Sequence, residues 1–193
     1  MRVISIFICV FLCGSLSEAC AEDITPSFSQ KLDIQVRYDN RSNRPSREQY
    51  RLRYYPSLAL TSTWSVNSFI VTGDDFSSSH NTFGSDTTDY LYARRLYLRH
   101  ETNAGKTELG IIPTYKGRVS STGLSKDGWI TGIRHVRKLQ NNTALEIVVG
   151  QLANAEASEA FNVGEEDEYF EIEYSAKMGG RHSYEASFER MLN

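Results

Sequence analysis

The stretch that decides the fold is "YLYARRLYLRHETNAGKTELGIIPTYKG", residues 90–117, in which two strand-like runs flank a short polar insert. Read with the two-residue period of a β-strand, Arg95 and Arg99 fall on one face, while Leu96 and Leu98 fall on the other. The insert has the composition of a tight turn, and the alternation resumes after it. The stretch therefore predicts a β-hairpin with one charged and one apolar face.

Two kinds of protein use such a hairpin. In a soluble sandwich the apolar face packs into a core, whereas in a membrane barrel it meets lipid and the polar face fills the lumen. Past the N-terminal leader the chain has no apolar run near 18 residues, so it offers no candidate transmembrane helix. A membrane protein of this composition is therefore expected to be a barrel.

The first 21 residues predict export. They combine Arg2 at a basic start with an apolar core and the small residues Ala19 and Ala21, which are typical of a cleaved signal peptide. A membrane anchor and a lipoprotein that keeps Cys20 are the alternatives. All cysteines lie in this leader, so residues 22–193 are expected to contain no disulfide. By their length, these residues are expected to form a single domain.

Composition argues against several functions. The net charge of −3 and the pI near 5.8 show no basic excess, so nucleic acid is not an expected partner. The four histidines have no metal-ligand spacing, and neither a Ser-His-acid triad nor a phosphate-binding glycine motif is found. The sequence therefore predicts a protein that is not an enzyme and that binds no metal or cofactor.

Nine alternating runs divide the chain after the leader. They are Lys31–Asp39, Gln49–Leu60, Ser65–Thr72, Asp89–His100, Thr107–Lys116, Trp129–Lys138, Thr143–Gln151, Glu168–Met178 and His182–Met191.

The connections between these runs alternate in length. The long ones are "NRSNRPSRE", "GDDFSSSHNTFGSDTT", "GRVSSTGLSKDG" and "LANAEASEAFNVGEED", and the short ones lie at "TSTW", "NAGK", "NN" and "GGR". Outer-membrane barrels have short periplasmic turns and long extracellular loops. The order therefore predicts an antiparallel, up-and-down transmembrane β-barrel of about 8 to 10 strands.

The pattern of alternating runs and of long and short connections resembles that of Gram-negative outer-membrane β-barrels. The runs "REQYRLRYYPSLAL", "SFIVTGDD", "YARRLYLRHE", "TELGIIP" and "GWITGIR" are similar to the N-terminal strands of porins of the alginate-export and phosphate-selective type. Bacterial single-chain barrels have an even strand number. Because nine runs are counted, either one strand is missed or merged, or the chain is a shortened porin.

If the apolar faces meet lipid, a charged set lines the lumen. Its members are Arg37, Arg51, Arg53, Arg95, Tyr97, Arg99, Glu108, Lys116, Glu146, Glu171, Glu173, Glu185 and Glu189. The arginines cluster in early strands and the glutamates in late ones. In a closed barrel the first and last strands are neighbours, so the two groups are expected to pair across the seam. Arg94 does not fit a regular strand, so it lies either at the outer interface or in a β-bulge that turns it inward.

The leading functional hypothesis is a porin-like barrel in the cell outer membrane that passes small hydrophilic solutes. Outer-membrane lipid and lipopolysaccharide are its expected partners, and the oligomeric state stays open. A barrel of about eight strands is filled by its own side chains, so a non-conducting structural or surface-interaction barrel is the first alternative. A soluble periplasmic β-barrel that binds a small ligand is the second.

Overall fold

The protein is all-β. The computed structural model describes residues 25–42, 44–73, 80–84, 91–114, 128–152, 157–162, 168–178 and 182–191. The predicted leader and Lys116 lie outside these ranges. The elements are β1 (Ser27–Arg41), β2 (Arg44–Ala59), β3 (Trp64–Thr72), β4 (Asn81–Thr82), β5 (Leu91–Thr102), β6 (Gly105–Pro113), β7 (Trp129–Lys138), β8 (Thr143–Gln151), the 3₁₀ turn η1 (Ala157–Glu159), β9 (Tyr169–Met178) and β10 (His182–Met191).

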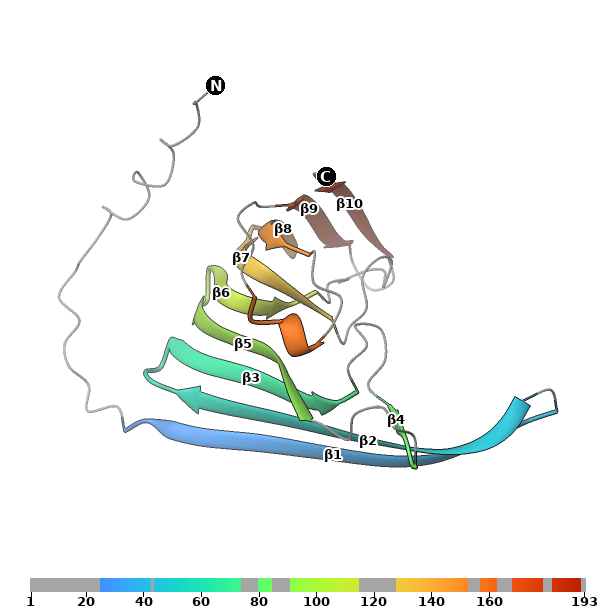
Figure 1. Cartoon of the computed structure of the whole chain (residues 1–193). Coiled ribbons are helices and arrows are strands. Elements are labelled where there is room, and N and C mark those ends of the chain that lie inside the picture. The colour runs from blue at the N-terminus through green and yellow to red at the C-terminus, as the bar shows by residue number, and fades with distance from the viewer. Residues whose placement is uncertain are drawn as a thin grey trace, which may run out of the picture.

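All strands join one antiparallel, up-and-down sheet. Nine of them follow one another in the order β1-β2-β3-β5-β6-β7-β8-β9-β10, and the two-residue β4 pairs with β2 beside this path (Figure 1). The nine correspond to the nine runs expected from the alternation. Up-and-down antiparallel topology is therefore confirmed.

The closed barrel that the sequence predicts is not formed. Among the described strands, β1 and β10 are the two ends of the hydrogen-bonded path and do not pair with each other. The sheet curls into an open trough with β1 along one rim and β10 along the other (Figure 1). The expected seam between first and last strands is therefore absent.

The first long connection is also different from the prediction. β1 continues to Arg41 and β2 begins at Arg44, so most of "NRSNRPSRE" is paired strand rather than loop. The ladder there includes Asp39 opposite Arg47, whose carboxylate and guanidinium lie 3.1 Å apart. Cross-strand pairing of opposite charges stabilises a strand that composition alone reads as a polar loop.

The two faces of the sheet differ in chemistry and in exposure. We call the face that carries Glu108 and Arg134 the inner face, because these side chains are only 0% and 3% exposed. The opposite, outer face carries Leu109 and Ile133, which are 56% and 43% exposed. Side chains on the inside of a curved sheet converge and shield one another, which explains the difference.

A row of glycines crosses the sheet where it curves. Gly110, Gly132 and Gly150 lie side by side on β6, β7 and β8, and the row ends in Tyr97 on β5 and Tyr169 on β9. Gly110 has a φ of 123°, and a Cβ there would lie 2.6 Å from the carbonyl oxygen of the facing strand. Glycine in a strand marks a bend or a close backbone approach, so this row is where the sheet can curl.

Two apolar clusters lie at the end of the sheet where the long connections emerge. Ile112, Ile130, Val148 and Tyr169 form one cluster on the inner face. The other consists of Ile111, Trp129, Ala157 and Ala160, with Tyr92 against it. Ala157 and Ala160, in and next to the η1 turn, thus pack against residues at the ends of β5, β6 and β7.

Candidate functional site: the charged inner face

Glu108 is the centre of the inner face. It lies in the middle of β6, and cationic side chains from β5, from β6 itself and from β7 surround it. Its Oε1 accepts from Arg99 at 2.7 Å and from Lys106 at 3.2 Å, while its Oε2 accepts from Arg134 at 3.0 Å. The carboxylate is fully buried, so three cations replace the water that it loses.

Arg134 connects this carboxylate to the next strand. Its Nε lies 2.9 Å from Oε1 of Glu146 on β8, an ion pair without hydrogen-bond alignment. A further nitrogen, Nη2, donates to the carbonyl oxygen of Pro113 at 2.6 Å. One guanidinium therefore joins β6, β7 and β8 at the level of the ion pairs, using the fixed fork geometry of arginine.

Two tyrosines lie beside the ion pairs. The hydroxyl of Tyr97 accepts a bond of 3.1 Å from Arg99, whose guanidinium also lies 5.4 Å from the ring of this tyrosine. On β9 the hydroxyl of Tyr169 donates to Oε2 of Glu171 at 2.6 Å, and both side chains are buried. The polar network therefore extends from β5 to β9 across the whole centre of the inner face.

A β-bulge places Arg94 inside. The register of β3 against β5 shifts between Phe69 and Ile70, whose partners are Arg95 and Ala93, so Arg94 is the extra residue. Its side chain is fully buried, donates to the carbonyl oxygen of Gly73 and lies 5.8 Å from the ring of Trp129. Of the two alternatives for Arg94, the bulge is the correct one.

Arg95 also turns inward. Its Nε donates to the carbonyl oxygen of Gly128 at 2.9 Å, and its guanidinium lies 4.7 Å from the ring of Phe69. Bonding to a main-chain carbonyl and stacking on an aromatic ring both favour arginine over lysine. The consecutive residues Arg94 and Arg95 thus donate to main-chain carbonyls directly after β3, at Gly73, and directly before β7, at Gly128.

The arginines of β1 and β2 lie on the same face but bond locally. Arg37 donates to the side-chain oxygen of Gln49, its cross-strand partner. Arg53 lies 3.9 Å from Asp33, which is directly opposite on β1. Arg51 shares this face by alternation. The seam across which these three residues were expected to meet the late glutamates does not form, because β1 and β10 are opposite ends of the path of described strands.

The other predicted lining residues of the described strands lie in or beside the central network, or on the strands β9 and β10. Tyr97, Arg99, Glu108 and Glu146 meet at the central network, with Arg95 and Glu171 nearby. Glu173 lies opposite Glu146 in the β8–β9 ladder and is 3% exposed. Glu185 and Glu189 lie on the inner face of the edge strand β10, where Glu189 is directly opposite Glu171 of β9.

Two residues of the central network were not predicted. Arg134 holds both glutamates, and Lys106 supplies a third cation, yet neither stood among the expected lining residues. The two-residue period gives no clear signal for Arg134, because Arg134 shares its face with Val136 while the basic Arg137 falls on the face of Ile133. Lys106 was assigned to a turn, whereas β6 begins at Gly105.

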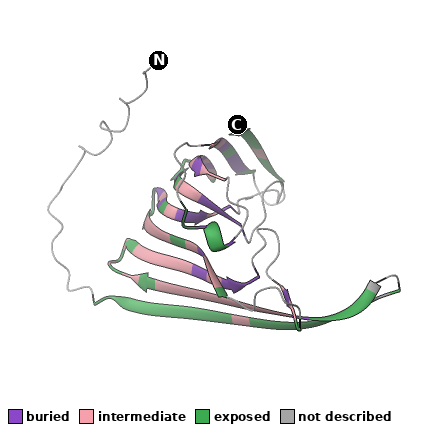
Figure 2. Cartoon of the chain, viewed as in Figure 1, coloured by how far each residue is buried: buried purple, intermediate pink, exposed green. Residues whose placement is uncertain are grey.

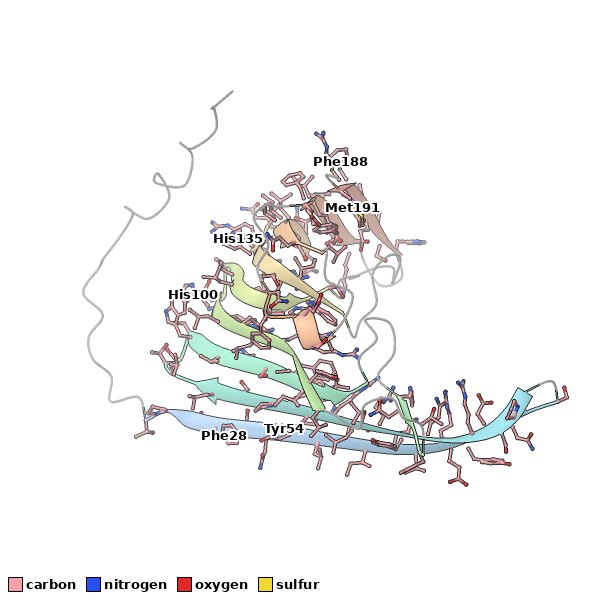
Figure 3. All side chains as sticks on the ribbon, in the orientation of Figure 1. Phe28, Tyr54, His100, His135, Phe188 and Met191 are labelled. Carbon is pink, nitrogen blue, oxygen red and sulfur yellow. The ribbon has the colours of Figure 1, made fainter. Side chains whose placement is uncertain are left out.

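The outer face is apolar and carries aromatic pairs. Trp64 and His100 stack with ring centroids 4.5 Å apart, and Tyr174 lies 6.0 Å from Tyr184. The outside of the curve bears the labelled Phe28, His100, His135 and Phe188 (Figure 3). Large exposed apolar side chains thus follow the outer face from β1 to β10.

Other kinds of site are not evident in the described part of the chain. There, no three side chains of His, Cys, Asp or Glu gather as a metal site. No helix among the described residues is long and apolar enough to cross a membrane. Compared with known proteins, the chain matches no family model and no curated protein. The two faces of the sheet are therefore the candidate functional surfaces.

Proposed function

We propose that this chain forms the wall of an outer-membrane β-barrel that admits small hydrophilic solutes. The observation that carries the proposal is the inverted polarity of the sheet. Glu108, Arg134 and Glu171 are buried on the inner face, whereas Ile34 and Val36 are 64% and 71% exposed on the outer face. Soluble proteins bury their apolar face instead, and such an inversion is what lipid outside and water inside require.

The size of the apolar surface supports a lipid environment. Exposed large apolar side chains occur on the outer face of most strands, including Leu32, Leu96, Leu109, Ile133 and Phe188. Soluble monomers rarely expose contiguous apolar patches of more than a few hundred Å². A hydrocarbon layer would remove this surface from water, and the aromatic pairs suit its interfaces.

The inner face supports passage of polar solutes. Arginine, lysine and glutamate side chains hold one another there, so the wall presents fixed charges and tyrosine hydroxyls. Charged rings of this kind control which ions enter a pore. Outer-membrane lipid and lipopolysaccharide are the proposed surroundings, and the cell outer membrane is the proposed location of the exported chain.

Two leucine substitutions test the membrane location. Leu109 lies in the middle of β6, and Leu139 lies beyond the end of β7; both are exposed on the present surface. In a membrane, Leu109→Lys should lower the free energy of unfolding by about 2 to 4 kcal/mol, and Leu139→Lys by about 1 kcal/mol or less. In a soluble protein the two variants should behave alike.

Conductance in planar bilayers tests the passage of solutes. The full chain should produce discrete current steps, and Arg99→Ala should shift the reversal potential toward cations because it removes a fixed positive charge. Fractionation of the chain as soluble material without detergent would contradict the proposal and favour the soluble ligand binder.

The density of the ion-pair network favours a second candidate. Glu108 and Arg134 fill the centre of the inner face with direct contacts, as in barrels whose interior is packed with side chains. A structural or surface-interaction barrel would then result. Stable insertion into lipid vesicles with no current steps would favour this function over the channel.

A further inference from the structure

The two rims of the trough are open for pairing. β1 has 15 residues, and Phe28, Leu32 and Ile34 on its outer face are exposed. Exposure extends along most of β1 and β10 (Figure 2). A long, exposed, apolar edge strand presents a row of backbone donors and acceptors, which is a template for another strand. Both rims are therefore candidate interaction surfaces.

The directions of these rims restrict how they can be closed. Every neighbouring pair along the path is antiparallel, so strand direction alternates. β1 is the first strand of the path and β10 is the ninth, so the two run in the same direction. A nine-stranded sheet cannot close on itself with antiparallel pairs alone.

The two strands at each side of the trough, β1 with β2 and β9 with β10, carry opposite charge on the inner face. Among described side chains on the inner face, β1 and β2 have five cations and two anions, a net charge of +3: Lys31, Arg37, Arg47, Arg51, Arg53, Asp33 and Asp39. The inner face of β9 and β10 has four anions and one cation, a net charge of −3: Glu171, Glu173, Glu185, Glu189 and Lys177. The basic rim of one sheet thus complements the acidic rim of another.

We propose that a second copy of this chain closes the trough. The two copies are related by a twofold axis along the barrel, so that β10 of each pairs with β1 of the other. Such a head-to-tail contact closes into a ring when the rotation permits it. Two paths of nine strands make a barrel of 18, an even number in the range that leaves an aqueous channel.

Charge decides between this arrangement and the other symmetric one. A twofold axis across the barrel would pair β1 with β1 and β10 with β10, which keeps every pair antiparallel but brings together two β10 strands that carry Glu185 and Glu189 on the inner face. The axis along the barrel makes both seams parallel, and parallel pairing is only slightly less stable per residue. It also keeps all long connections at one end. The two-copy barrel rests on the proposed function in one respect: it would form the pore through which the solutes pass.

Mixed disulfide formation tests the arrangement. Gln35 on β1 and Ser187 on β10 are neutral inner-face residues at the two rims. We would coexpress a Gln35→Cys chain and a Ser187→Cys chain with different tags and oxidise them, repeating the test with Ser183→Cys for another register. The expected product is a dimer that carries both tags and has about twice the mass of one tagged chain. The unsubstituted chain reports any background from Cys9, Cys13 and Cys20.

Expression of each cysteine variant alone distinguishes the two symmetric arrangements. Each cysteine variant alone should give no dimer above background, because equivalent strands do not meet. Cross-linking of Gln35→Cys with itself would establish the isologous arrangement and overturn the proposal. The mass of the unsubstituted complex in detergent or buffer is the second measurement: two copies support the proposal, while one copy or any other number overturns it.

Charge reversal sharpens the test. Glu185→Lys combined with Glu189→Lys should convert the two-copy complex to single chains, and Lys31→Glu with Arg37→Glu in the same chain should restore it. Failure of the first pair to dissociate the complex would contradict the role of charge. Failure of the proposed function is distinguishable: a two-copy complex that stays soluble overturns the membrane pore, and a conducting single chain overturns the dimer.

Discussion

The centre and the rims of this sheet are stabilised in different ways. In the centre, β5 to β8 each have two neighbours, and Glu108 is surrounded by cations from three positions. At the rims, β1 and β10 have one neighbour each among the described strands and keep apolar side chains exposed. The contacts that stabilise the sheet are therefore densest in its centre, and the rims are the edges at which we propose association. Four substitutions test this contrast.

The largest effect is expected at Glu108. Glu108→Gln removes the only charge that Arg99, Lys106 and Arg134 share, leaving cations close together on a buried surface. The free energy of unfolding should fall by about 4 kcal/mol, because a buried charge without its partner is expensive. Denaturant titration measures this change. Glu48→Gln, at an exposed glutamate on β2, is the control and should change stability by less than about 0.5 kcal/mol. Equal effects would place the stability of the sheet elsewhere.

The second effect concerns curvature. A Cβ at Gly132 would clash with the carbonyl oxygen of Val149 and lie 2.6 Å from the Cα of Gly150. Gly132→Ala should therefore force the backbones of β7 and β8 apart and lower stability by about 2 kcal/mol. Thermal unfolding monitored by circular dichroism would detect the loss.

Gly84→Ala is the matched control for curvature. Gly84 has a φ of 70° but nothing within 4 Å of an added Cβ, so this change introduces backbone strain without a clash. Its cost should be about 1 kcal/mol. A larger loss for Gly84→Ala than for Gly132→Ala would show that close packing at the glycine row is unimportant.

A smaller effect is expected at the bulge. Arg94→Leu keeps an apolar side chain near Trp129 but removes the bond to the carbonyl oxygen of Gly73. A lost hydrogen bond from a charged group should reduce stability by about 1.5 kcal/mol. Arg190→Leu on exposed β10 is the control. Tryptophan emission should change for Arg94→Leu alone, and an unchanged spectrum with unchanged stability would contradict the buried position of Arg94.

The smallest effect on folding is expected at the rim. Val36→Asp changes an exposed residue of β1 and should alter the unfolding free energy of a single chain by less than about 0.5 kcal/mol. It should nevertheless weaken association of the rims or insertion into lipid, because it places a charge on the apolar face. Sedimentation velocity measures association directly. A large loss of intrinsic stability would show that β1 belongs to the stabilising centre.

Sequence reasoning succeeded where the determining interactions are local. The nine runs and the sorting of Arg99 and Glu108 onto one face follow from a two-residue period, and the antiparallel order follows from the alternating lengths of the connections. The polar segment before Glu48 was misread as a loop, because its pairing depends on the facing strand. Arg134 was overlooked because basic residues fall on both faces of its strand.

The sequence by itself determined the strands, their faces and the separation of basic and acidic residues along the chain. Only the tertiary structure decided the degree of closure, the partners of each charge and the inward turn of Arg94. The physical reason is that side-chain alternation is a property of one strand, whereas curvature and register are collective properties of neighbouring strands. Gly110 and Gly132 become a bend only when β6 and β7 lie side by side, and β1 becomes an open rim only when the curve ends before reaching it.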